Sequence, residues 1–127
     1  EDYRQEVLNL VNAQRAKYGL TALEMGDDNL TAAAQTRAEE IAVVNSHVRP
    51  DGSKCFTVLK DYGVTDTPTG ENAAWGSVSP EEVVNAWMNS EGHRANILNP
   101  EARKMSVGYY YNSNSTWGHQ WIQIFTK

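Results

Sequence analysis

The feature that most restricts the fold of this chain is a change in its hydrophobic period near residue 100. Before that point, apolar residues recur mostly at helical spacing, whereas the later segments "KMSVGYYY" and "HQWIQIFTK" are rich in β-branched and aromatic residues. The stretch "NSNSTWG" between them is predicted to be a loop, so the two segments should form an antiparallel hairpin. Helices followed by a hairpin indicate an α+β fold rather than a parallel βαβ arrangement.

Two amphipathic helices are predicted in the first part of the chain. The first lies within residues 2–20, with Asp2 as a candidate N-cap and Gly19 as the C-terminal stop. After a loop, "TALEMGDDN", the second runs from about residue 30 to residue 44, and its small side chains predict close packing against another element. The apolar faces are Val7, Leu8, Leu10, Val11 and Tyr18 in the first helix and Leu30, Ala34, Ala38 and Ile41 in the second.

Two further helices are predicted after a Pro-Asp-Gly turn at residues 50–52. The shorter one lies within residues 53–63. The other begins in "SPEEVVNAWMNS", where Ser79 is the N-cap, Pro80 takes the first helical position and Glu82 completes a capping box. The stretch "VTDTPTGENAAWGS" between these helices is predicted to be a loop that leads into a short strand.

Length and charge restrict the class of protein. A chain of 127 residues can form one hydrophobic core, so we expect a single domain over residues 1–127. A net charge of −5 without a run of Lys and Arg argues against nucleic acid and anionic membrane surfaces as main partners. No apolar run approaches the ~20 residues of a membrane span. The single Cys55 excludes an internal disulfide and is interpreted as a small apolar residue within a helix.

The familiar local signatures of hydrolases are absent from the sequence. There is no HExxH zinc-protease motif, no GxSxG elbow and no Gly-rich phosphate-binding loop. What remains is a scatter of residues in predicted loops: His47, Glu71, Glu91, His93 and His119. For each residue alone, a structural role is the more common one, such as a hydrogen-bonded imidazole or a carboxylate that braces a turn.

Four motifs taken together are more informative. In order along the chain, "NSHVRPDG", "GENAAWG", "VVNAWMNSEGHRANILNP" and "VGYYY…WIQIF" resemble the CAP superfamily of cysteine-rich secretory proteins, insect-venom antigens and plant pathogenesis-related proteins. The opening helix matches as well, and the variant resembles the bacterial branch of SCP-like extracellular proteins. This resemblance implies an α-β-α sandwich, with a small antiparallel sheet between helices.

The resemblance also implies a central cleft that holds two His and two Glu, which in some members bind a divalent metal such as zinc. His47 matches the first family His, and Glu71 matches the Glu of the "GEN" motif. The second family Glu would fall three residues after Trp87, at Ser90, and Glu91 lies one position later.

The second cleft His is harder to place. If Gln123 matches the Gln of a "GHYTQ"-like strand, the His position becomes Gln120, and His119 falls one residue away, on the opposite face of the strand. The bacterial branch carries the "GHR" motif instead, which makes His93 the best candidate. We therefore expect His47, Glu71 and His93 to lie near one another. Glu91, His119 and Gln120 are the candidates for the fourth position.

Three functions fit these residues, and we rank binding or interaction ahead of enzyme. The first is a binding module for a small apolar ligand, such as the lipids or sterols that some relatives bind, or for a cell-envelope component. Its aromatic candidates are Trp75, Trp87, Tyr109, Tyr111, Trp117 and Trp121.

The second function is a metal-dependent hydrolase, in which His47, Glu71 and His93 hold zinc or another divalent cation beside an open water position. The third is a protein-interaction domain, acting in the envelope or on a host factor, in which the cluster is a structural brace. The family is mostly secreted or surface-displayed. We therefore expect an extracellular or cell-surface location, with a signal peptide already removed.

Overall fold

A computed structural model of the chain describes residues 3–44, 46–114 and 118–127. Within these ranges four strands form one sheet in the order β1-β3-β4-β2, and five helices accompany it. The pairs β3–β4 and β2–β4 are antiparallel, and the short β1 runs parallel to β3. The elements in chain order are α1 (Tyr3–Lys17), β1 (Glu24–Met25), α2 (Asp28–Ile41), α3 (Thr57–Asp61), β2 (Pro68–Trp75), α4 (Pro80–Met88), α5 (Glu91–Ile97), β3 (Lys104–Tyr111) and β4 (His119–Thr126).

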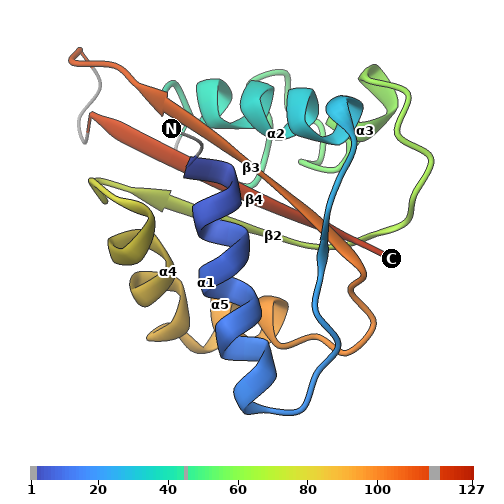
Figure 1. Ribbon diagram of the computed structural model, residues 1–127. Helices are drawn as coiled ribbons and strands as arrows, with labels where there is room; N and C mark the ends of the chain where they lie inside the picture. Colours follow the sequence, from blue (N-terminus) through green and yellow to red (C-terminus); the bar gives the residue numbers. More distant parts are fainter. Residues whose placement is uncertain (1–2, 45, 115–117) are drawn as a thin grey trace.

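Helices cover both faces of the sheet, which confirms the predicted α+β sandwich (Figure 1). Alternate residues of β4 point to opposite faces. Trp121 and Phe125 join a core with residues of α1, α4 and α5. Ile122 and Ile124 join a second core with residues of α2 and α3. None of the helices in the described ranges has the length and apolarity that crossing a membrane requires.

The sequence predicts the ends of helices correctly where a capping residue or a terminal glycine marks them. Helix α4 begins at Pro80, and the Ser79 hydroxyl accepts a hydrogen bond from the Glu82 N–H at 3.1 Å, as predicted. The reciprocal half of the capping box differs, because the Glu82 carboxylate accepts from the Val78 N–H at 2.9 Å. Gly19 follows α1 with φ of +72°, as expected of a C-terminal stop. The proposed cap Asp2 lies outside the described residues. Helix α2 is capped by Asp27 and both begins and ends earlier than predicted.

Several element predictions were wrong. The strand predicted after the loop at residues 64–67 is longer than expected, because Pro68–Trp75 forms a full edge strand that includes the "GEN" motif and pairs with β4. The segment Glu91–Ile97, predicted to be irregular, is helix α5, and it carries His93. Helix α3 is shorter than expected and leaves Cys55 outside the helix. Tyr18, assigned to the apolar face of α1, is 53% exposed.

Helix α2 lies unusually close to strand β3. The Gln35 amide donates to the Tyr109 carbonyl at 2.8 Å and accepts from the Tyr109 N–H at 3.0 Å. The Thr31 and Ser106 hydroxyls lie 2.7 Å apart. Gly108 makes this approach feasible, since a Cβ atom there would overlap the Ala34 carbonyl oxygen of α2.

We expect Gly108→Ala to destabilise the protein by about 1–3 kcal/mol in urea unfolding, because the added methyl group must push α2 away from β3. The control is Gly92→Ala in α5, where an added Cβ meets nothing within 4 Å. That substitution should be neutral, or stabilise by up to about 1 kcal/mol. Equal effects of the two substitutions would contradict the close approach of α2 to β3.

Candidate functional site

The site is built on a buried ion pair between helix α2 and strand β2. Arg37 donates from Nε to Glu71 Oε2 at 2.8 Å and from Nη2 to Glu71 Oε1 at 3.1 Å. The exposed fractions of the two side chains are 0% and 2%. The remaining Arg37 donors reach Glu40 Oε1 at 2.9 Å and the Ser46 carbonyl at 3.1 Å. A bidentate guanidinium therefore fixes the orientation of the Glu71 carboxylate.

Strand geometry directs Glu71 to one side of the sheet and Asn72 to the other. Successive side chains of a strand alternate between faces, so Glu71 meets α2 while Asn72 meets α5. Burial alone would raise the pKa of Glu71, but the hydrogen bonds and charges of His47 and Arg37 outweigh it and lower that pKa. Glu71 is therefore a fixed anion near neutral pH.

His47 lies on the solvent side of this carboxylate. Its Nδ1 is 2.7 Å from Glu71 Oε1, and its side chain is 56% exposed. The hydrogen bond from Glu71 raises the pKa of His47, and the Glu71 charge adds to this against the opposing effects of burial and Arg37. The imidazole can therefore take up a proton or present its ring to solvent.

A second ion-pair network holds the segment that carries His47. Arg49 donates to both oxygens of Glu40, with a shortest distance of 2.7 Å, and to Asp61 at 2.8 Å. The isolated bridge between Val48 and Lys54 closes the turn. Because Glu40 also accepts from Arg37, the two networks connect helix α2, the 46–54 turn and helix α3.

Cys55 completes the cluster, which the sequence did not indicate. Ligand atoms of His47, Cys55 and Glu71 all lie within 4.8 Å of one another. Burial raises the pKa of the Cys55 thiol to about 11, and the neighbouring Glu71 charge and hydrogen bond act in the same direction. Without a bound cation, Cys55 is therefore a neutral thiol at physiological pH.

His93 lies in helix α5, which packs against strand β2. Strand β2 is at the edge of the sheet, so groups from its two faces can meet around that edge. The Asn72 amide donates to the His93 carbonyl at 3.1 Å, and Asn96 donates to Asn72 at 2.9 Å, which fixes α5 against β2. Burial lowers the pKa of His93, and the charge of His47 lowers it further. The effect of the His47 charge relates His93 to His47, whereas the proximity of the His93 ring to Glu71 stays a prediction.

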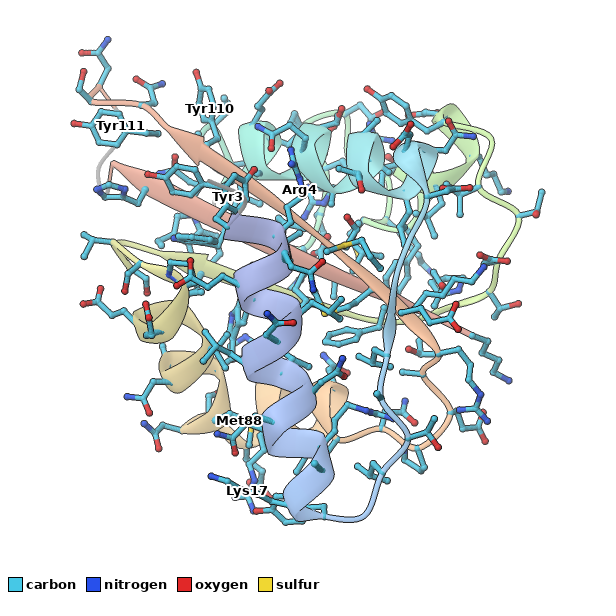
Figure 2. All side chains as sticks on the ribbon, viewed as in Figure 1. Tyr3, Arg4, Lys17, Met88, Tyr110 and Tyr111 are labelled. Atoms are coloured by element: carbon cyan, nitrogen blue, oxygen red, sulfur yellow. The ribbon has the colours of Figure 1, made fainter. Side chains whose placement is uncertain are left out.

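The structure does not bring the other candidates to the cluster. His119 opens β4 opposite Tyr111, and its Nδ1 lies 2.6 Å from the Tyr109 hydroxyl, whereas Glu71 pairs with Ile124 further along β4. Figure 2 shows Tyr111 at the far end of β3. Register explains the difference, because β4 carries His119 away from the level of Glu71.

Glu91 and Gln120 also lie apart from the Arg37–Glu71 pair. Glu91 is exposed in the first turn of α5, and Ser90, at the position of the second family Glu, is the N-cap residue. Among the described residues, no hydrogen bond or ion pair joins Glu91 to His47 or Glu71. Gln120 is buried and pairs with Trp75 and Tyr110.

The most important residue that sequence reasoning missed is Arg37. It lies on the buried stripe of α2, three residues after Ala34 and four before Ile41, where an apolar residue is expected. A charged residue on such a stripe implies a buried partner of opposite charge, and this signal was available in the sequence. The placement of Cys55 beside Glu71 depends on tertiary contacts, and no pattern in the neighbouring sequence indicates it.

An apolar hollow adjoins the cluster. Its volume is about 370 Å³, and it lies between helix α3 and the segment at residues 64–68. Cys55 faces Glu71, while its neighbours Lys54 and Phe56 line the hollow. The other lining residues are Thr57, Leu59, Lys60, Val64, Thr65, Asp66, Thr67 and Pro68.

Comparisons with known proteins agree with this architecture. The family model of the CAP, cysteine-rich secretory protein, family matches residues 8–125. The uncharacterized protein YkwD of Bacillus subtilis is 42% identical over 122 residues, which cover 94% of this chain and 47% of YkwD. The uncharacterized membrane protein YlbC of the same organism is 33% identical over 115 residues, or 87% of this chain and 33% of YlbC. The chain thus spans less than half the length of these relatives.

Two solved structures with the same fold are those of an extracellular protein and an outer surface protein. An extracellular protein containing a SCP domain from Bacillus anthracis superposes with a TM-score of 0.85 at 26% identity, over 98% of this chain and 40% of that one. An outer surface protein from Borrelia burgdorferi gives a TM-score of 0.77 at 25% identity, over 97% and 90% of the respective chains.

We expect Glu71→Gln to lower the free energy of unfolding by about 3–5 kcal/mol, because it leaves Arg37 buried without its counter-charge. The control is Asp66→Asn, which removes one partner of the half-exposed Lys104–Asp66 pair and should cost about 0–1 kcal/mol. Chemical denaturation of both variants checks this. Similar losses would show that Glu71 is no more important to the fold than a surface carboxylate.

The contribution of His47 to stability should depend on pH. Because its folded-state pKa is raised above the ordinary 6.5, protonated His47 stabilises the fold fully below pH 6.5, and this contribution is lost as pH rises through the folded-state pKa. His47→Gln should therefore lower Tm more at about pH 6 than at about pH 9, relative to wild type. Lys17→Gln is the control, with the same difference expected at both pH values. A constant difference for His47→Gln would refute the proposed pairing with Glu71.

Proposed function

Because the chain belongs to the CAP family of cysteine-rich secretory proteins, we propose that it is an extracellular binding module that takes up a small apolar ligand with an anionic head. The extracellular location is supported by the Bacillus anthracis and Borrelia burgdorferi proteins, one described as extracellular and the other as an outer surface protein. The proposal concerns the region that this chain covers, since the curated relatives are more than twice as long.

The observation that carries the proposal is the apolar hollow beside α3. A volume of about 370 Å³ lies within the range of ~300–1,000 Å³ typical of small-molecule sites. Phe56, Leu59 and Val64 supply apolar surface for a hydrocarbon chain. Lys54 and Lys60, both exposed, lie at the same hollow and favour a carboxylate or another anionic head. A fatty acid combines these two properties.

The cluster beside the hollow supports binding ahead of hydrolysis. Both oxygens of Glu71 already accept hydrogen bonds from Arg37, and its pKa is lowered, whereas a general base at neutral pH needs a pKa raised toward ~7. In this arrangement Glu71 anchors the 46–57 segment and so keeps Phe56 in the wall of the hollow.

Decanoate titration by calorimetry, with decanol as the uncharged comparison, tests the proposal. Wild type should bind decanoate more tightly than decanol, and Lys60→Glu should weaken decanoate binding by about fivefold, the equivalent of ~1 kcal/mol, while changing decanol little. Phe56→Ser should weaken both ligands, because it removes apolar contact surface.

The matched control is Lys17→Glu. Lys17 also lies in the last turn of a helix, but Figure 2 shows it at the end of α1, far from α3. This variant should bind decanoate as wild type does. The proposal fails if wild type binds neither compound, or if Lys17→Glu and Lys60→Glu weaken decanoate binding equally.

A further inference from the structure

Three side chains of metal-ligand type converge beside the Arg37–Glu71 pair. Ligand atoms of His47, Cys55 and Glu71 lie within 4.8 Å of one another, and no other group of His, Cys, Asp and Glu in the described residues is arranged closely enough to hold a metal ion. This set differs from the one that the sequence resemblance implied. The third ligand atom belongs to Cys55 and not to His93.

We propose that Cys55 binds, as a thiolate, a divalent metal ion of the zinc class together with His47 and Glu71. Zinc takes sulfur, nitrogen and oxygen ligands in tetrahedral geometry, and the thiolate selects it over Mg²⁺ and Ca²⁺, which prefer oxygen ligands alone. Three protein ligands leave the fourth position to water. His47 is 56% exposed, so an ion can reach the site from solvent.

Small side-chain movements can bring the three ligand atoms to the separations that a bound ion requires. Metal–ligand bonds of about 2.0–2.3 Å in a tetrahedron separate the ligand atoms by about 3.3–3.8 Å. His47 Nδ1 and Glu71 Oε1 are 2.7 Å apart, and all pairs in the group are within 4.8 Å. The exposed imidazole can therefore withdraw slightly while the thiol approaches, and Glu71 keeps its place on Arg37.

The hydrogen-bond pattern shows what the ion would replace. Glu71 interacts with His47 and with the Cys55 thiol through hydrogen bonds, so protons occupy the positions between these ligand atoms. On binding, the Cys55 S–H bond breaks, the sulfur keeps the electron pair and bonds to the ion, and the proton leaves to solvent. Above its raised pKa His47 is neutral, and the proton that its Nδ1 directs at Glu71 moves to Nε2 by exchange with solvent, which leaves the Nδ1 lone pair free to bond to the ion. This tautomer change alters no proton count. One proton is therefore released for each ion bound.

Arg37 makes two anionic ligands compatible with a buried position. The ion brings two positive charges against the thiolate and the carboxylate, so these ligands neutralise it. Arg37 keeps its own counter-charge in Glu40, at 2.9 Å, and continues to orient Glu71 through Nε. A ligand whose position is fixed in this way loses little freedom on binding.

Titration with Co²⁺ under reducing conditions tests the proposal, because a cobalt–thiolate bond gives a near-ultraviolet charge-transfer band. Wild type should develop this band with one ion per chain, and Zn²⁺ should abolish it by displacement. Cys55→Ser should remove the band, and His47→Gln should weaken binding by about 100-fold or more, since changes that only misorient a ligand already cost ~10–100-fold.

Two histidine variants separate this site from other arrangements. His93→Gln and His119→Gln should keep both the band and the affinity, because neither residue belongs to the group. No band in wild type would overturn the proposal, and so would a band that persists in Cys55→Ser. Loss of affinity in His93→Gln comparable to that in His47→Gln would assign the ion to the histidine pair instead.

A measurement on the unmodified chain covers the case in which a variant does not fold. Zn²⁺ should slow the alkylation of Cys55 and raise the Tm of wild type, since binding to the folded state alone stabilises it. Alkylation at the same rate with and without Zn²⁺ would contradict thiolate ligation directly. Neither measurement uses a fatty acid. A negative result for metal binding therefore leaves the proposed ligand binding in the apolar hollow untouched, and the reverse also holds.

Discussion

The buried pair of Arg37 and Glu71 is the interaction on which the arrangement of this site depends. It joins α2 to the edge strand β2 across one face of the sheet, and each partner would be costly to bury alone. Arg37 also reaches Glu40, through which Arg49 holds the turn that carries His47. His47 and Cys55 then have defined positions because the Glu71 carboxylate between them cannot rotate freely.

The same short segment serves two sites. Cys55 belongs to the cluster, whereas its neighbours Lys54 and Phe56 line the apolar hollow. A backbone movement at Cys55 will therefore also move the wall of the hollow. This arrangement gives the cluster a role without requiring catalysis. It fixes a wall of the hollow in the metal-free protein, and it offers an ion three ligands whose orientation is already determined.

Local physics explains which parts of the fold could be predicted. Ser79 and Pro80 begin α4 through contacts within one turn, so the sequence predicts that end correctly. Strand β2 was predicted too short, because Glu71 and Asn72 are buried only through partners on α2 and α5, which no local pattern reveals. The motif resemblance did associate His47, Glu71 and His93. It could not include Cys55, whose place beside Glu71 follows from how the 46–57 segment packs.

We infer that Glu71 is a fixed anion that organises the site and does not exchange protons at neutral pH. The most direct test is a ¹³C NMR titration of the Glu71 side-chain carboxyl in the metal-free wild-type protein. We expect a pKa below the ordinary 4.5, because the hydrogen bonds and charges of His47 and Arg37 outweigh burial. A pKa raised toward ~6–7, the range of a general acid or base, would contradict it.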